Sequence, residues 1–132
     1  MTDQLNGQCL CGGVKFRLAA PFRDVVVCHC RQCARWTGHA VAMTSVPDDR
    51  FEMLAGEHLL SWFKASAAAD RGFCKNCGST LFWKPVGEAR ISVSAGALDP
   101  PTGLKVEKHI YAADKSDYFV IGDHPVQLAS DG

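Results

Sequence analysis

Cys9-x-Cys11-Gly12-Gly13 is the first of two stretches that indicate how this chain folds, and Cys74-x-x-Cys77-Gly78 is the second. In both, closely spaced cysteines precede a glycine. Such thiolates can bind one metal ion together, because a tight turn directs both sulfurs to one point. Glycine permits the positive φ that such a turn often needs, and backbone amides can then face the sulfurs. Two knuckles of this kind, from different hairpins, can face each other and close a four-thiolate site.

The remaining cysteines form a third group, Cys28-x-Cys30-x-x-Cys33, so that all seven cysteines of the chain lie in short-spaced groups. Seven thiolates are one fewer than two tetrahedral zinc sites require. Four plus three gives one closed site and one with an open position. An open position is what a catalytic or ligand-binding zinc needs. The triplet can leave that position to water, to a thiol or to a substrate atom.

The spacing alone leaves three alternatives open. The cysteines can be buried and inert, as free cysteines often are. The second site can be closed by a histidine, for which His29 and His39 are the nearest in sequence. Cys9 and Cys11 can also pair with two of the middle three. Disulfides within the groups are disfavoured, because a disulfide needs a specific Cα separation and torsion.

Composition narrows the class of protein. The chain has 132 residues, of which 47% are hydrophobic and 21% charged, which is typical of one soluble globular domain. We expect a single domain over residues 1–132, with an ordered core over about 5–125 and a loose end at 129–132. Fourteen basic residues balance fourteen acidic ones, so no nucleic-acid partner is expected.

The sequence also bears on the compartment. No apolar run approaches the roughly 20 residues of a membrane span, so no membrane partner is expected. The first residues lack the basic and apolar regions of a signal peptide. Clustered cysteines in a chain that is not exported point to metal binding or catalysis rather than to disulfides. We therefore expect a cytoplasmic protein.

Short apolar segments between glycines and prolines predict an all-β fold. Alternation at Val14, Phe16 and Leu18 is typical of a half-buried strand. One helical turn is expected over 31–36. Further strands are expected over 25–27, 40–46, 59–63, 80–83, 91–95, 106–111 and 118–121.

In these motifs the chain resembles the glutathione-dependent formaldehyde-activating family, also called the centromere protein V/GFA domain. The resemblance is carried by 7–14, by Cys28-x-Cys30-x-x-Cys33, by 73–79, and by Gly96-x-Leu98-Asp99 with 109–111. It implies a β-tent fold of small coiled antiparallel sheets with zinc knuckles.

The resemblance also implies two zinc ions per chain and a role for each. A structural zinc would be held by Cys9, Cys11, Cys74 and Cys77, and a catalytic zinc by Cys28, Cys30 and Cys33. The implied activity is that of a carbon–sulfur lyase, which condenses formaldehyde with glutathione to S-(hydroxymethyl)glutathione. Its partner would be a small-molecule thiol such as glutathione.

The alternative function is a non-enzymatic zinc module that binds a protein or a small ligand. Glutathione has two carboxylates, and the cations closest to the cysteines in sequence are Arg31, Arg35, Arg71 and Lys75. Each is more typical of a solvated surface charge than of a ligand contact. His109 and the aromatic residues Trp36, Trp62, Trp83 and Tyr118 can line a pocket or belong to the core.

Overall fold

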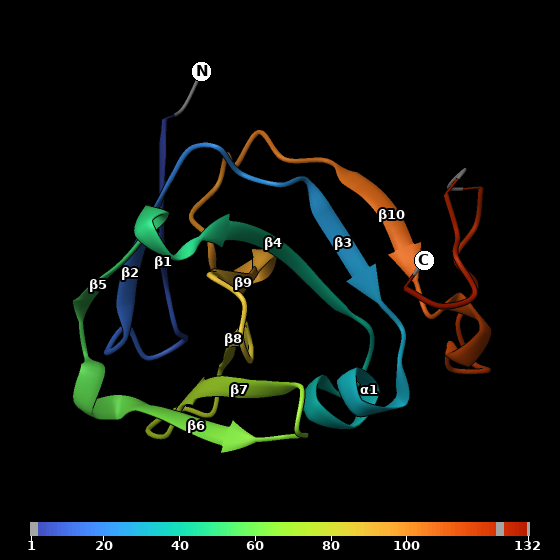
Figure 1. Cartoon of the computed structure of the whole chain (residues 1–132), viewed down its shortest axis with the longest axis horizontal. Coiled ribbons are helices and arrows are strands. Elements are labelled where there is room, and N and C mark those ends of the chain that lie inside the picture. The colour runs from blue at the N-terminus through green and yellow to red at the C-terminus, as the bar shows by residue number, and fades with distance from the viewer. Residues whose placement is uncertain (1–2, 124–125, 132) are drawn as a thin grey trace. The chain divides into compact units, whose positions relative to one another are not determined.

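Strands dominate the computed structural model, which describes residues 3–123 and 126–131 (Figure 1). The all-β prediction is confirmed, and the expected turn at 31–36 forms the only α-helix among these residues. The elements are β1 (Gln4–Gln8), β2 (Lys15–Ala19), β3 (Val25–Cys28), α1 (Arg31–Thr37), β4 (Val41–Pro47), β5 (Phe51–Ala55), β6 (Leu60–Lys64), β7 (Ala69–Cys74), β8 (Thr80–Pro85), β9 (Arg90–Ser94) and β10 (Val106–Ile110). Short 3₁₀ turns lie at Asp48–Arg50, Glu57–Leu59, Ala95–Ala97 and Ala112–Asp114.

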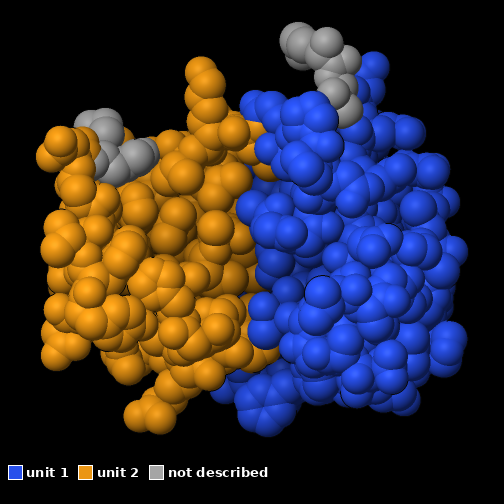
Figure 2. All heavy atoms as spheres, turned by 180° about the vertical axis from the view of Figure 1, so that it is seen from behind, with its two compact units in different colours: residues 1–23, 44–103 blue, residues 24–43, 104–132 orange. Residues whose placement is uncertain are grey.

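The chain divides into two compact units, each built from two separate segments (Figure 2). Unit 1 contains residues 1–23 and 44–103, and unit 2 contains residues 24–43 and 104–132. Strand β4 contributes its first three residues to unit 2 and the remainder to unit 1. The group of Cys9, Cys11, Cys74 and Cys77 lies within unit 1, and the group of Cys28, Cys30 and Cys33 lies within unit 2.

Unit 1 contains two antiparallel arrangements of strands. Strands β1, β2 and β5 form a three-stranded sheet with β2 in the middle. The other arrangement has the hydrogen-bonded order β9-β8-β7-β6, with the end of β4 beside β9. The turn between β1 and β2 and the turn between β7 and β8 carry the two cysteine pairs.

The core of unit 1 is centred on aromatic rings. Phe16 and Leu18, which the alternation in β2 predicts to be buried, have no exposed surface. The ring of Phe16 meets that of Phe82 edge to face, with centroids 5.0 Å apart, and Phe51 meets Phe82 in the same way at 5.1 Å. This edge-to-face geometry adds stabilisation beyond the burial of apolar area. The core fixes the strands that carry the cysteine pairs.

Unit 2 combines an antiparallel and a parallel pair. Strand β3 pairs with β4 antiparallel and with β10 parallel, in a register that puts Ile110 beside Cys28. The end of β10 and the chain after it are held by residues 126–130, since the amides of His109 and Ala112 donate to the carbonyls of Val126 and Leu128. The amide of Tyr111 donates to Ser130 at 3.3 Å, although the sequence predicts a loose end here.

Most of the expected strands are present, and one expectation is wrong. Residues 118–121 form no strand. Strands β1, β5 and β7 were not expected; the sequences of β1 and β7 contain too few alternating apolar residues to indicate a strand. In β7 the buried positions include Arg71, which is 4% exposed, and Gly72. Among the described residues, no helix is long and apolar enough to cross a membrane.

Candidate metal centres

The first candidate centre is built by two similar turns in unit 1. Cys9 follows β1, and the amide of Gly12 donates to its carbonyl at 3.0 Å. Cys74 ends β7, and the amide of Gly78 donates to its carbonyl at 2.7 Å. Gly12 and Gly78 have φ of 77° and 80°, the left-handed conformation that the sequence predicts for glycine after a cysteine pair.

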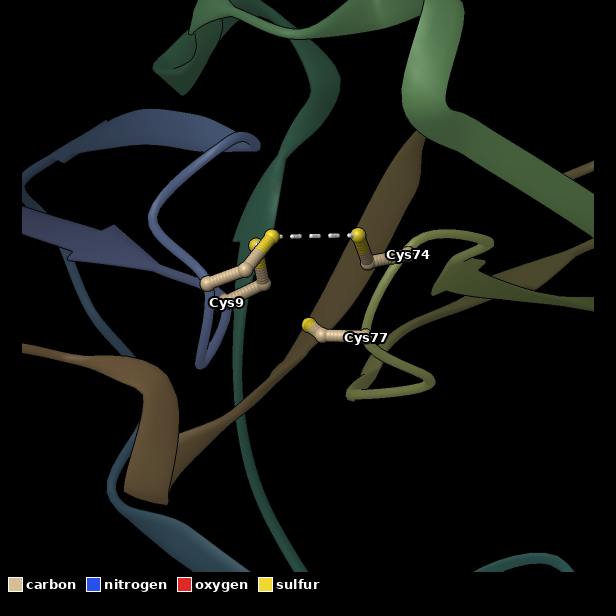
Figure 3. A group of neighbouring side chains, drawn as sticks. Cys9, Cys74 and Cys77 are labelled. Atoms are coloured by element: carbon tan, nitrogen blue, oxygen red, sulfur yellow. Dashed lines mark hydrogen bonds between the residues drawn. The ribbon is translucent and has the colours of Figure 1, made fainter.

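The four sulfurs of these turns come together, all within 4.8 Å of one another. Figure 3 shows Cys9 on one turn facing Cys74 and Cys77 on the other. The Cys11 and Cys74 sulfurs are 3.9 Å apart, and those of Cys9 and Cys11 are 3.5 Å apart. Zinc–sulfur bonds of about 2.3 Å would place tetrahedral ligands about 3.8 Å from one another. The donor set therefore fits a four-coordinate zinc.

Backbone and hydroxyl groups support these sulfurs. The Val14 amide donates to the Cys9 sulfur at 3.2 Å, and the Leu10 amide donates to the Ser79 hydroxyl at 2.9 Å, which links the two turns. The Ser79 hydroxyl lies 3.2 Å from the Cys77 sulfur. This contact, with backbone amides, lowers the pKa of Cys77 to about 5. Contacts led by the Asn76 side chain also lower the pKa of Cys11, and a lower pKa makes it easier for a thiol to form the thiolate that metals bind.

The second candidate centre is the triplet in unit 2. Cys28 ends β3, Cys30 is the N-cap of α1, and Cys33 lies in the first turn of that helix. The Cys33 amide donates to the Cys30 sulfur at 3.3 Å, which is the usual contact of an N-cap side chain with the third residue after it. The three sulfurs all lie within 4.8 Å of one another. Neighbouring thiols, Cys30 first, raise the pKa of Cys28 in the absence of a metal.

The triplet has three sulfur ligands, and no histidine or carboxylate among residues 3–123 and 126–131 completes the group. This argues against His29 or His39 as a fourth ligand. The His29 ring instead lies 2.8 Å from His109, Nε2 to Nδ1, and His39 Nδ1 lies 3.2 Å from the Tyr118 hydroxyl. Cys9 and Cys11, for which the spacing left a pairing with the triplet open, are grouped within unit 1 with Cys74 and Cys77.

A histidine pair holds the loop that contains the triplet. His29 is 3% exposed, and its amide donates to the Ile110 carbonyl at 3.0 Å. Burial, and then the charge of His109, lower the pKa of His29. Its ring stacks on His109 with centroids 5.1 Å apart. His109, one of the residues that the sequence suggested for a pocket, therefore contacts the loop that contains the triplet.

Tyr111 is a residue near the triplet that sequence reasoning did not single out as functional. It is the only non-glycine residue with positive φ, 54°, among the described parts of the chain. A bulky residue in this conformation is unusual and often marks a functional region. Partial burial, followed by Asp131 and the Cys28 and Cys30 thiols, raises the pKa of Tyr111. Nothing in the sequence itself signals this turn.

Fold and site together define a small β protein with one group of four cysteines and one group of three, each of which could hold a metal ion. A family model described as glutathione-dependent formaldehyde-activating enzyme matches residues 4–114, and the chain belongs to this family. The resemblance seen in the motifs is thereby confirmed.

Relatives and a solved structure agree with this membership. An uncharacterized lyase from Schizosaccharomyces pombe is 30% identical over 83 residues, which are 61% of this chain and 57% of that protein, so the chain spans little more than half of this relative. A Halomonas elongata protein, provisionally named glutathione-dependent formaldehyde-activating enzyme, is 27% identical over 89% of this chain and 80% of its own. A crystal structure of a Rhodobacter sphaeroides protein has the same fold, with a TM-score of 0.60, 17% identity and coverage of 93% of this chain and 98% of its own.

Proposed function

We propose that the protein is a zinc-dependent carbon–sulfur lyase of the S-(hydroxymethyl)glutathione synthase type, acting on the adduct of a thiol and an aldehyde. The observation that carries the proposal is the triplet of Cys28, Cys30 and Cys33, which provides three ligands and lacks a fourth among the described residues. Family membership and the names of the two relatives support the same reaction class.

The reaction joins a thiol to a carbonyl carbon. A carbon–sulfur bond forms, the π electrons of the carbonyl move to its oxygen, and that oxygen takes up the proton that the thiol releases. The reverse reaction splits the adduct into the same two molecules. A zinc ion in the triplet would favour the thiolate form of the substrate, which is the nucleophile. Three thiolate ligands would reduce its strength as a Lewis acid, so activation of the thiol is the favoured role.

The protein's own residues would prepare this site. Cys30 both provides a ligand and caps α1, so the helix fixes its sulfur. Cys33 is 5% exposed, which keeps one side of the triplet dry. The His29–His109 contact holds the intervening loop, so that the three sulfurs stay close together.

We propose a separate, structural role for zinc at Cys9, Cys11, Cys74 and Cys77. All four sulfurs of that group face one another, so a tetrahedral ion there would have no open position. The seven cysteines, all of which the structure describes, form no disulfide, which suits a reducing compartment such as the cytoplasm.

The test is exchange NMR of glutathione with formaldehyde, with and without the zinc-loaded protein. We expect the protein to accelerate exchange between free formaldehyde and the adduct above the spontaneous rate. Cys30→Ser should abolish this acceleration while keeping the far-UV circular dichroism of the folded chain. No acceleration by protein that carries two zinc ions per chain would contradict the lyase proposal and favour the zinc module that only binds.

A further inference from the structure

A small pocket of unit 2 lies next to the triplet in sequence. It has a volume of about 340 Å³ and is lined by Arg31, Ala113, Asp114, Lys115, Ser116, Asp117 and Tyr118, a set that we call the charged pocket. Arg31 directly follows Cys30, and the other lining residues come from the chain after β10. The family match ends at residue 114, so the lining residues at 115–118 lie beyond it.

The charged pocket has two cations and two anions. Arg31 and Lys115 are the cations, and Asp114 and Asp117 are the anions. In the described part of the chain, ion pairs form between other residues and none of these four charges takes part in one. Arg31 donates only a long hydrogen bond of 3.4 Å, to the Ser116 hydroxyl, and Lys115 donates to the Phe119 carbonyl at 2.9 Å. Each charge can therefore bind a ligand group without breaking an ion pair.

Tyr118, which lines the pocket, and Phe119, which follows it in the chain, contact two histidines near the triplet. The Phe119 ring stacks on His29 with centroids 6.0 Å apart and meets His39 edge to face at 4.6 Å. The Tyr118 hydroxyl lies 3.2 Å from His39 Nδ1. His29 lies between two cysteines of the triplet, and His39 follows α1. These contacts hold the pocket wall in place relative to the three sulfurs.

We propose that the charged pocket binds the zwitterionic amino-acid end of the thiol substrate, with its carboxylate at Arg31 and Lys115 and its ammonium at Asp114 and Asp117. This inference rests on the proposed function and identifies the class of thiol. A ligand that carries only a carboxylate would be repelled by the two aspartates, and a ligand that carries only a cation would be repelled by Arg31 and Lys115. The volume is near the lower end of the range of about 300–1,000 Å³ for ligand pockets, which suits one amino acid.

The probe is S-methylglutathione, which keeps the zwitterionic end and has no free thiol. Its binding to the zinc-loaded full chain can be followed by chemical-shift titration, independently of any reaction. We expect Arg31→Gln and Asp117→Asn each to weaken binding about tenfold, because each removes one charged partner of the ligand. Arg35→Gln, an exposed arginine of α1 outside the pocket, and Asp123→Asn are matched controls that should leave binding unchanged.

The variants that lose affinity for the probe show whether the pocket binds a zwitterion. Weaker binding in both pocket variants, with both controls unchanged, supports the zwitterion site. A loss in Arg31→Gln alone overturns it, because that result describes a site for simple anions. Equal binding by all four variants also overturns it, and so does a failure of wild-type protein to bind the probe.

The outcome can be separated from that of the lyase proposal. If the probe binds as expected but exchange of formaldehyde is not accelerated, the pocket stands and the lyase proposal fails. If exchange is accelerated but the KM for glutathione is unchanged in Arg31→Gln and Asp117→Asn, the pocket proposal fails alone. Acceleration with a KM raised about tenfold in both variants supports both.

Discussion

The two cysteine centres differ in how the chain builds them. The group of Cys9, Cys11, Cys74 and Cys77 joins two turns that are far apart in sequence, with 63 positions separating Cys11 from Cys74. The triplet comes from one short stretch, from the end of β3 to the first turn of α1. A metal in the first group closes a long loop, whereas a metal in the triplet closes almost none.

This difference assigns different consequences to the two metals. Cross-linking distant segments lowers the entropy of the unfolded chain, and the effect grows with the length of the closed loop. The triplet gains little from such a cross-link, and its loop is already fixed by hydrogen bonds to Ile110 and His109. We therefore expect the first metal to support the fold and the second to be available for chemistry.

The largest expected effect is loss of the closed centre in Cys77→Ser. Structural zinc contributes on the order of 10 kcal/mol in small zinc-binding peptides, which is comparable with the whole stability of a domain. We expect Cys77→Ser to be insoluble or unfolded. The matched variant Cys33→Ser should stay soluble, with a circular dichroism spectrum like that of wild type. Equal soluble yields of the two variants would remove the distinction between the centres.

A smaller effect is expected where protein contacts, and not metal, hold the triplet loop. His109→Ala would leave the buried Nε2 of His29 without its partner, at a cost of about 1–3 kcal/mol. The free energy of unfolding in urea measures this cost. His58→Ala, at an exposed histidine of unit 1, is the control and should change stability by less than about 0.5 kcal/mol. If the two variants lose equal stability, the histidine pair does not hold the loop.

The smallest effect concerns one turn of the closed centre. Gly78 has φ of 80°, and a Cβ there would meet no atom within 4 Å, so Gly78→Ala isolates the backbone strain. A left-handed residue with a Cβ costs roughly 1–2 kcal/mol, and we expect thermal unfolding to shift accordingly. Gly96→Ala also meets no atom within 4 Å and has no positive φ. A shift in Gly96→Ala as large as that in Gly78→Ala would show that strain is not the cause.

The cysteine groups could be predicted from the sequence, because the spacing of metal ligands within a group is a short-range pattern. Two knuckles, each followed by glycine, predicted the four sulfurs that the structure brings together, and the triplet followed by subtraction. The strands of residues 15–19 and 25–28 were equally clear, because apolar alternation and β-branched runs are local signals.

The surroundings of the triplet could not be predicted from the sequence, since they depend on pairing between segments that are far apart in the chain. The parallel register of β10 with β3 puts Ile110 beside Cys28, and no local pattern specifies it. The strand expected over 118–121 is absent, and its apolar residues were the misleading signal: Tyr118 is 69% and Val120 81% exposed. Tyr111 and the charged pocket both result from this tertiary arrangement.

The most direct measurement is stepwise removal of zinc by a chelator, with the released metal counted and near-UV circular dichroism recorded together. The account predicts two zinc ions per wild-type chain. The zinc ion of the triplet should leave while the spectrum stays native, and it should already be missing from Cys33→Ser. The zinc ion of the four-cysteine group should leave only as the chain unfolds. Simultaneous loss of both ions, or unfolding when the triplet loses its ion, would contradict the division between a structural and an open centre.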